Sequence, residues 1–161
     1  MSLSVRPAVF PRDTAAVGAL VGAYLRQTEA EKAERGLAAD TFPDRYAREI
    51  DDPATAFAGR RVHVAALDEE DVGLVVSTVT PLGTELSRFW TDPRARGRGV
   101  GSALLTAALA AAARPVRLSV WEWREPALRM YLSAGFEIAA SWDDRPGLVC
   151  LELRSALTGS R

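Results

Sequence analysis

The sequence predicts one mixed α/β domain over residues 1–161, and three observations support this. Strand-like and helix-like apolar runs follow one another in the order β-α-α-β-β-β-α-β-α-β-β. Two of these passages are β-α-β units, which imply parallel pairing late in the chain. The 161 residues, 48% hydrophobic and 25% charged, are enough for a full hydrophobic core in an ordinary globular domain.

The chain begins with a predicted strand and a long helix. Residues 4–9 form the expected strand, and Asp13 or Thr14 then caps a helix that runs to about Gln27. The apolar residues of this helix recur at helical spacing and predict a buried face: Val17, Leu20, Val21 and Leu25.

The middle of the chain predicts one short helix and a hairpin. Residues 28–60 are polar and irregular, apart from a helix expected near 44–50. Two apolar runs, 62–67 and 73–80, flank the acidic turn 68–71. Strand-forming residues on both sides of a polar turn favour an antiparallel hairpin.

The second half alternates strands with helices. A short helix is expected to start at Glu125-Pro126 and to be ended by Gly135, because Pro is favoured at the first helical position and Gly just past the last. The other elements are expected as strands at 84–91, 116–121, 136–139 and 148–153, and as a helix at 102–113.

A glycine loop joins the strand at 84–91 to the helix that follows. In Arg96-Gly97-Arg98-Gly99-Val100-Gly101, three glycines let the backbone turn tightly and expose its N–H groups. The helix start adds the unpaired amides of its first turn, including that of Ser102, and the positive end of its dipole. This combination favours a phosphate or pyrophosphate site over a simple tight connection, with Arg96 and Arg98 as better cationic candidates than Arg94.

Two other phosphate-loop interpretations fail on spacing. A nucleoside-triphosphate loop needs Gly-Lys-Ser/Thr, and this loop has no lysine. A dinucleotide loop needs a third Gly or Ala, but that position holds Ser102 counted from Gly97 and Leu104 counted from Gly99. A nucleotide-dependent oxidoreductase is therefore disfavoured.

The remaining composition narrows the function classes. A net charge of −1 gives no basic field for nucleic acid. Cys150 and His63, the only cysteine and histidine, are expected in strands, so a zinc site or a His-based triad is not expected. No secretory leader is visible, and the longest uncharged run, 99–113, is shorter than the ~20 residues of a membrane span. A cytoplasmic protein without membrane contact is expected.

These motifs together resemble the GNAT superfamily of acyl-CoA-dependent N-acyltransferases. Residues 85–93 are similar to the family's fourth strand, and Arg96–Gly101 fits its pyrophosphate loop, (Gln/Arg)-x-x-Gly-x-(Gly/Ala). Residues 127–136, with Tyr131 and Gly135-Phe136, resemble its second cofactor helix and exit turn. The resemblance implies a mixed, mostly antiparallel sheet of six to seven strands, parallel pairing at the loop and about four flanking helices.

The resemblance also implies acetyl-CoA as co-substrate and roles for particular residues. Glu85 is the first candidate for the base that deprotonates the amine, although it could be an exposed strand glutamate beside Arg88; Glu122 is the reserve. Tyr131 is the candidate acid that protonates the departing thiolate; alternatively, it is a core aromatic residue whose hydroxyl reaches solvent. A backbone amide at Phe89, Trp90 or Thr91 would stabilise the oxyanion. Arg124 departs from the family, where many members carry Asn, which leaves one cofactor or water contact open.

The acceptor is expected to be a small-molecule or peptide amine. By resemblance its pocket involves residues 24–60 and 141–146, where eight acidic residues outnumber four basic ones between Glu29 and Asp52. Three tryptophans and two aspartates are further candidates: Trp121, Trp123, Trp142, Asp143 and Asp144. Core packing, for Trp121 above all, and a solvated helix face are the simpler interpretations. The resemblance allows a homodimer, and a non-catalytic acyl-CoA-binding module is the alternative function.

Overall fold

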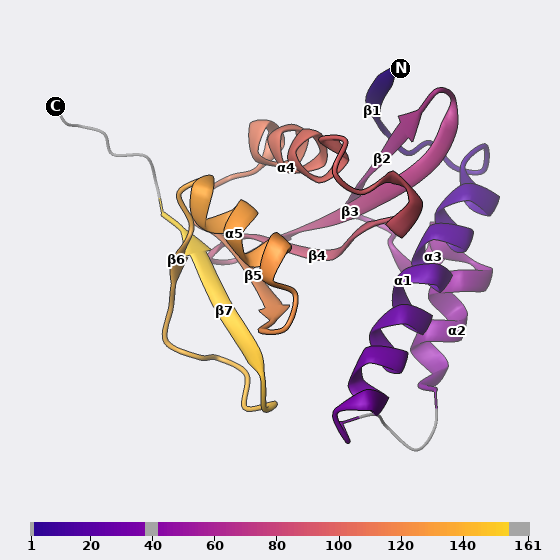
Figure 1. The fold of residues 1–161 in the computed structure, drawn as a ribbon. Helices are drawn as coiled ribbons and strands as arrows, with labels where there is room; N and C mark the ends of the chain where they lie inside the picture. Colours follow the sequence, from indigo (N-terminus) through magenta and orange to yellow (C-terminus); the bar gives the residue numbers. More distant parts are fainter. Residues whose placement is uncertain (1, 38–41, 155–161) are drawn as a thin grey trace, which may run out of the picture. The chain divides into compact units, whose positions relative to one another are not determined.

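The computed structural model describes residues 2–37 and 42–154 (Figure 1). Its elements follow the predicted order, except for a short helix at Pro53–Ala56, in a stretch expected to be irregular, and a 3₁₀ turn at Pro93–Ala95, which the sequence did not predict. They are β1 (Leu3–Pro7), α1 (Thr14–Glu34), α2 (Asp44–Asp51), α3 (Pro53–Ala56), β2 (Arg61–Leu67), β3 (Glu70–Thr80), β4 (Gly83–Thr91), the 3₁₀ turn η1 (Pro93–Ala95), α4 (Val100–Ala111), β5 (Val116–Trp121), α5 (Glu125–Ser133), β6 (Glu137–Ile138) and β7 (Leu148–Leu153). The strands form a hydrogen-bonded sheet in the order β1-β2-β3-β4-β5-β7-β6. The predicted mixed sheet is confirmed.

The described chain divides into two compact units. Unit 1 comprises residues 1–76 and 88–108, and unit 2 comprises 77–87 and 109–161, within the limits of the described residues. Both β3 and β4 contribute residues to each unit.

The core of unit 1 lies between α1 and the strands. β1 pairs antiparallel with β2, from Leu3 opposite Leu67 to Pro7 opposite His63. The predicted apolar face of α1 is buried and consists of Val17, Leu20, Val21 and Leu25. It packs with side chains of α2, β2, β3 and β4, namely Tyr46, Val62, Val64, Leu74, Val76 and Trp90. Figure 1 shows α1 beside α2 and α3.

The helix α1 is longer than the sequence predicts. It continues from Gln27 to Glu34 through a stretch that we expected to be irregular. Two side-chain pairs one turn apart hold these polar turns: Gln27 donates to Glu31 at 2.7 Å, and Lys32 pairs with Glu29 at 2.9 Å. Such pairs stabilise a helix without an apolar stripe, so hydrophobic periodicity does not detect it.

The two buried glycines of α1 differ in what a side chain at their positions would meet. A Cβ added at Gly18 would collide with the backbone carbonyl oxygen of Ile50, the penultimate residue of α2. A Cβ added at Gly22 would meet only the flexible guanidinium of Arg26, at 3.1 Å. The close packing of α1 on α2 therefore depends on Gly18 and not on Gly22.

Gly18→Ala is expected to destabilise the protein, whereas Gly22→Ala is the matched control. Both changes gain helix propensity, but only the first forces α1 away from the backbone of α2, at a cost of about 1–3 kcal/mol. Thermal unfolding should show a lower Tm for Gly18→Ala and an unchanged or higher Tm for Gly22→Ala. Equal Tm values for the two variants would contradict this account.

Asp13 occupies the N-cap position of α1, but its carboxylate does not cap the helix. It accepts hydrogen bonds from the Val9 amide at 2.8 Å and from the guanidinium groups of Arg6 and Arg12 at 3.0 and 3.1 Å. Burial raises the pKa of this carboxyl, but the hydrogen bonds outweigh it and lower the pKa to about 2. Asp13 thus fixes the chain between β1 and α1.

Stability should therefore decrease as the pH falls from about 4 towards 2. Because the folded-state pKa is depressed, the contribution of Asp13 is complete above its unfolded-state pKa of 3.8 and is lost as the carboxyl is protonated in the folded protein. The loss is on the order of 2 kcal/mol. Urea unfolding at successive pH values should show this decrease in the wild type and a flatter profile in Asp13→Asn; identical profiles would contradict it.

Two tight features fix the strands of unit 1. Asp68 and Glu69 have positive φ angles of 51° and 70° and form the two-residue turn of the β2–β3 hairpin. On β3, a Cβ added at Gly73 would meet the carbonyl oxygen of Trp90 at 2.9 Å and the side chains of Leu104 and Val100 at 3.0 and 3.2 Å. The strand β3 thus lies against β4 and α4 with no room for a side chain.

Unit 2 contains the parallel pairing that the sequence predicts. β4 pairs parallel with β5 through Thr84 opposite Val116 and Glu85 opposite Arg117. The second β-α-β passage differs from the expected pairing: β7 lies between β5 and β6 and is antiparallel to both. As predicted, α5 has Pro126 in its first turn, and Gly135 follows its end with a φ of 103°.

Candidate functional site

The glycine loop of unit 1 has the geometry of an anion-binding turn. It follows η1 and leads into α4, and Gly97 and Gly99 adopt left-handed φ angles of 78° and 81°. α4 begins two residues earlier than predicted, so Val100 and Gly101 lie in its first turn and not in the loop. A Cβ added at Gly97 or Gly99 would meet no atom within 4 Å. The carbonyl of Gly99 accepts the first hydrogen bond of α4 from the amide of Ala103. The amides at the start of α4 have no partner within the helix and can face a bound anion.

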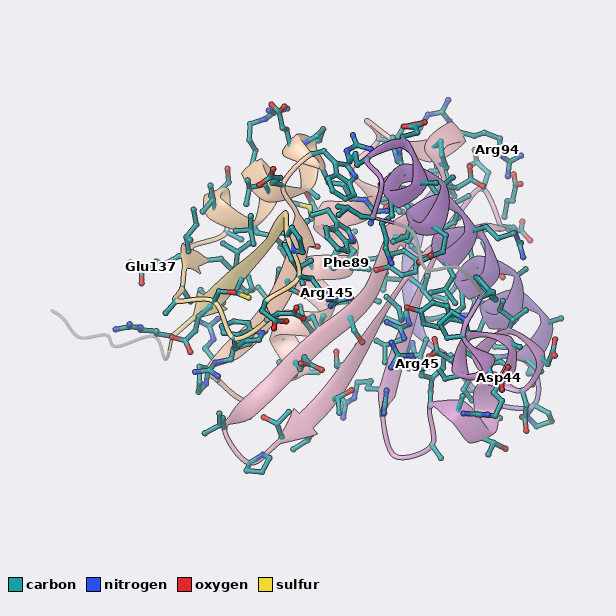
Figure 2. All side chains as sticks on the ribbon, turned by 90° about the horizontal axis from the view of Figure 1, so that it is seen from below. Asp44, Arg45, Phe89, Arg94, Glu137 and Arg145 are labelled. Carbon is teal, nitrogen blue, oxygen red and sulfur yellow. The ribbon has the colours of Figure 1, made fainter. Side chains whose placement is uncertain are left out.

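The three arginines near the loop differ in their surroundings. Arg94 lies at the surface (Figure 2), and its guanidinium donates hydrogen bonds to Asp92 and Glu70. Arg96 donates through Nε to the carbonyl of Thr91 at 3.1 Å. Among residues 2–37 and 42–154, Arg98 makes no hydrogen bond or ion pair, and it is exposed. Of the expected cations, Arg98 therefore has the most freedom to reach a phosphate.

Gln27 links α1 both to β4, at Trp90, and to the start of the glycine loop, at Arg96. Its Oε1 accepts a hydrogen bond from Nε1 of Trp90 at 2.8 Å and one from Nη2 of Arg96 at 3.3 Å. Trp90 is 6% exposed, so its indole N–H needs this acceptor. Sequence reasoning missed Gln27, because glutamine is a common residue on the solvent-facing side of a helix. It holds the end of β4 and the first residue of the loop together.

The strand β4 bends at Arg88, directly before the residues expected to offer amides. Arg88 has a φ of 52°, in the left-handed region. Its guanidinium binds Glu49 of α2 twice, Nε to Oε1 at 2.7 Å and Nη2 to Oε2 at 2.8 Å. Burial opposes the charge of Arg88, but Glu49 outweighs it and raises the pKa of Arg88 above its usual value. Arg88 therefore pairs with Glu49, which the sequence did not indicate as a partner.

The candidate acid and base residues lie in unit 2. Glu85 is exposed on β4 opposite Arg117, and Glu122 is exposed just past the end of β5, where its amide donates to the carbonyl of Gly147. Tyr131 of α5 is 4% exposed, and its ring meets that of Phe136 edge-on at 5.8 Å. Arg124 is the N-cap residue of α5, with no side-chain cap hydrogen bond.

The expected acceptor residues of unit 2 form an aromatic and charged cluster. The rings of Trp121 and Trp123 stack at 4.8 Å, and Trp121 is only 6% exposed, which agrees with its interpretation as a core residue. Arg145, in the segment before β7 (Figure 2), binds Asp143 at 2.8 Å and lies 5.6 Å from the Trp121 ring. Trp142 is 42% exposed. In the other expected region, residues 38–41, with Asp40, lie outside the described residues.

The two other reactive side chains are buried. His63 is 6% exposed on β2, and burial, together with the charge of Arg61, lowers its pKa, so it is neutral near pH 7. Cys150 is buried on β7. No group of three or more His, Cys, Asp or Glu in the described part of the chain is placed to hold a metal ion. Within the same ranges, no helix has both the length and the apolar character of a membrane span.

Comparison with known proteins gives one family match and many structural matches. Residues 58–138 match the model of the acetyltransferase (GNAT) domain. The PaiA N-acetyltransferase of Thermoplasma acidophilum, in complex with coenzyme A, is 17% identical with a TM-score of 0.73, over 96% of this chain and 100% of that one. An acetyltransferase of Thermus thermophilus is 19% identical with a TM-score of 0.69, over 96% and 98%.

A third structure contains the acetylated coenzyme. YncA of Salmonella typhimurium, with its cofactor acetyl-CoA, is 16% identical with a TM-score of 0.67, over 96% of this chain and 94% of that one. At these identities the likenesses establish a common fold. No curated protein matches the chain significantly.

Proposed function

The chain belongs to the GNAT family of acetyltransferases, and on that basis we propose that it transfers the acetyl group of acetyl-CoA directly to a primary amine in a ternary complex. The observation that carries this proposal is the loop at Gly97 and Gly99, whose left-handed glycines precede the first-turn amides of α4. This loop would hold the diphosphate of the coenzyme, with Arg98 as a mobile cation. The family pattern at 58–138 includes segments of both units, which supports one catalytic domain.

The proposed chemistry has three requirements. An alkylamine has a pKa near ~10.4 and must lose a proton before it attacks, for which Glu85 is the proposed base and Glu122 the reserve. The carbonyl oxygen becomes anionic, and a backbone amide among Phe89, Trp90 and Thr91 would donate to it. The amine nitrogen bonds to the acetyl carbon as the carbon–sulfur bond breaks, and Tyr131 would give the thiolate its proton.

Tyr131→Phe is expected to lower kcat by about 10-fold, because the phenol is removed while the buried ring is kept. The effect is modest, since a thiolate whose conjugate acid has a pKa near ~8.5 already leaves readily. Steady-state kinetics with acetyl-CoA measures kcat, and calorimetry with coenzyme A should show unchanged affinity. A wild-type kcat in this variant would leave Tyr131 as a packing residue.

The full-length chain tests the function directly. Calorimetry with coenzyme A measures binding, and release of free thiol from acetyl-CoA measures transfer across a panel of small amines and peptide N-termini. Binding together with amine-dependent thiol release is the expected result. Binding without release under any amine would identify a non-catalytic acyl-CoA-binding module, and absence of binding would overturn the proposal.

A further inference from the structure

The backbone of β4 contains a strained residue that its sequence position does not require. Three non-glycine residues in the described ranges have positive φ: Asp68, Glu69 and Arg88. Asp68 and Glu69 form the turn of the β2–β3 hairpin, where a two-residue loop requires positive φ angles. Arg88 instead lies within a strand, and an L-residue keeps a left-handed backbone there only when its surroundings enforce it.

The side chain of Arg88 is held by α2. Both oxygens of Glu49 receive guanidinium hydrogen bonds, at 2.7 and 2.8 Å, in a two-point contact. The side chains are only 22% and 10% exposed, and the Tyr46 ring lies 5.7 Å from the guanidinium carbon. A buried carboxylate that binds at two points fixes the direction of the arginine side chain and restricts the backbone from which it projects.

The position of this contact suggests its purpose. A left-handed residue within a strand redirects the amides that follow it. Those amides belong to Phe89, Trp90 and Thr91, the residues proposed to face the developing oxyanion. A donor must be placed before the reaction to stabilise a transition state, so a small rotation of this backbone would cost rate.

We propose that Glu49 is a positioning residue of the acetyl transfer: by clamping Arg88 it fixes the bend in β4 and thereby aims the amides of residues 89–91. This inference rests on the proposed function. Glu49 does not touch the reacting atoms, and its effect passes through Arg88 and the backbone of β4.

A purely structural ion pair would behave differently from a positioning pair. It would tie α2 to β4, and its loss would lower Tm while each folded molecule kept its kcat. A positioning role instead lowers kcat and leaves the coenzyme affinity intact, because the loop at 96–101 does not contain the pair. A lower kcat at unchanged coenzyme affinity therefore indicates the positioning role, and an unchanged kcat indicates the structural role.

The experiment compares folded variants, verified by circular dichroism, in thiol-release kinetics and coenzyme A calorimetry. Glu49→Gln keeps the shape but removes the charge, and it should lower kcat by about 10-fold or more with the coenzyme Kd unchanged within about 3-fold. Asp71→Asn, which likewise removes the charge from an ion pair of the same unit, that of Arg6 and Asp71 at 2.9 Å, is the matched control and should retain kcat. A wild-type kcat in Glu49→Gln would overturn the inference.

A pair of double variants tests the backbone itself and remains informative if Glu49→Gln folds poorly. Glu49→Gln with Arg88→Gly lets residue 88 adopt the left-handed conformation without a side chain, whereas Glu49→Gln with Arg88→Ala opposes it. The glycine form should retain a kcat several-fold higher than the alanine form, and equal values would contradict the proposed bend. A wild type that binds no coenzyme A would instead overturn the proposed function, and this inference with it.

Discussion

Gly99→Val is expected to weaken coenzyme A binding by about 100-fold or more, which corresponds to ~2.7 kcal/mol. Gly99 has a φ of 81°, and a β-branched residue does not tolerate that conformation. The loop would rearrange, and its amides would no longer converge on the diphosphate. Since an added Cβ at Gly99 meets nothing within 4 Å, the variant loses the loop geometry without a steric clash in the core. Calorimetry with coenzyme A measures the effect.

Gly59→Val is the matched control for this prediction. Gly59 has nearly the same φ, 79°, and an equally open environment, but it lies between α3 and β2. The two variants therefore carry a similar backbone strain and should lose similar stability. Only Gly99→Val should lose coenzyme affinity; if both variants bind coenzyme A like the wild type, the loop is not the diphosphate site.

Glu85→Gln is expected to lower kcat by on the order of 100-fold, the magnitude of general base catalysis, without changing coenzyme affinity. Glutamine keeps the size of the side chain but cannot accept the proton of the ammonium. The rate of thiol release, measured from pH 6 to 10, should rise more steeply with pH in the variant, because the amine must then lose its proton to solvent. Unchanged kinetics would remove Glu85 from the role of base.

Glu122→Gln provides the comparison. Glu122 is exposed like Glu85, but it follows β5, whereas Glu85 lies in the parallel ladder opposite Arg117. If Glu85 is the base, Glu122→Gln should retain kcat. The reverse pattern would assign the base to Glu122, and loss in neither variant would point to water as the proton acceptor.

The fold could be predicted from the sequence where local chemistry determines it. Pro126 and Gly135 bound α5, and the glycine loop separates β4 from α4, as expected. The last two turns of α1 could not be predicted from hydrophobic periodicity, since polar pairs such as Lys32 with Glu29 hold them. The insertion of β7 between β5 and β6 is a long-range pairing, and no local pattern specifies it.

The site was predictable only in part, for a similar reason. The loop residues are contiguous and share one backbone requirement, so the sequence alone predicts the left-handed glycines at 97 and 99, while their role in diphosphate binding stays a prediction. Gln27 and Glu49 act on residues 63 and 39 positions away, Trp90 and Arg88. One sequence carries no signal for such pairs, because glutamine and glutamate are ordinary residues on a helix surface.

The absence of a side chain at Gly73 lets α4, the helix that follows the glycine loop, pack closely on β3. Atoms of Trp90, Val100 and Leu104 all lie within 3.2 Å of the position that a Cβ of Gly73 would occupy, so α4 packs tightly against β3. This packing fixes the first turn of α4, so the proposed binding of a diphosphate there would need little ordering of the chain. Amide hydrogen exchange in the body of α4 should accordingly be slow in the empty protein and change little when coenzyme is added.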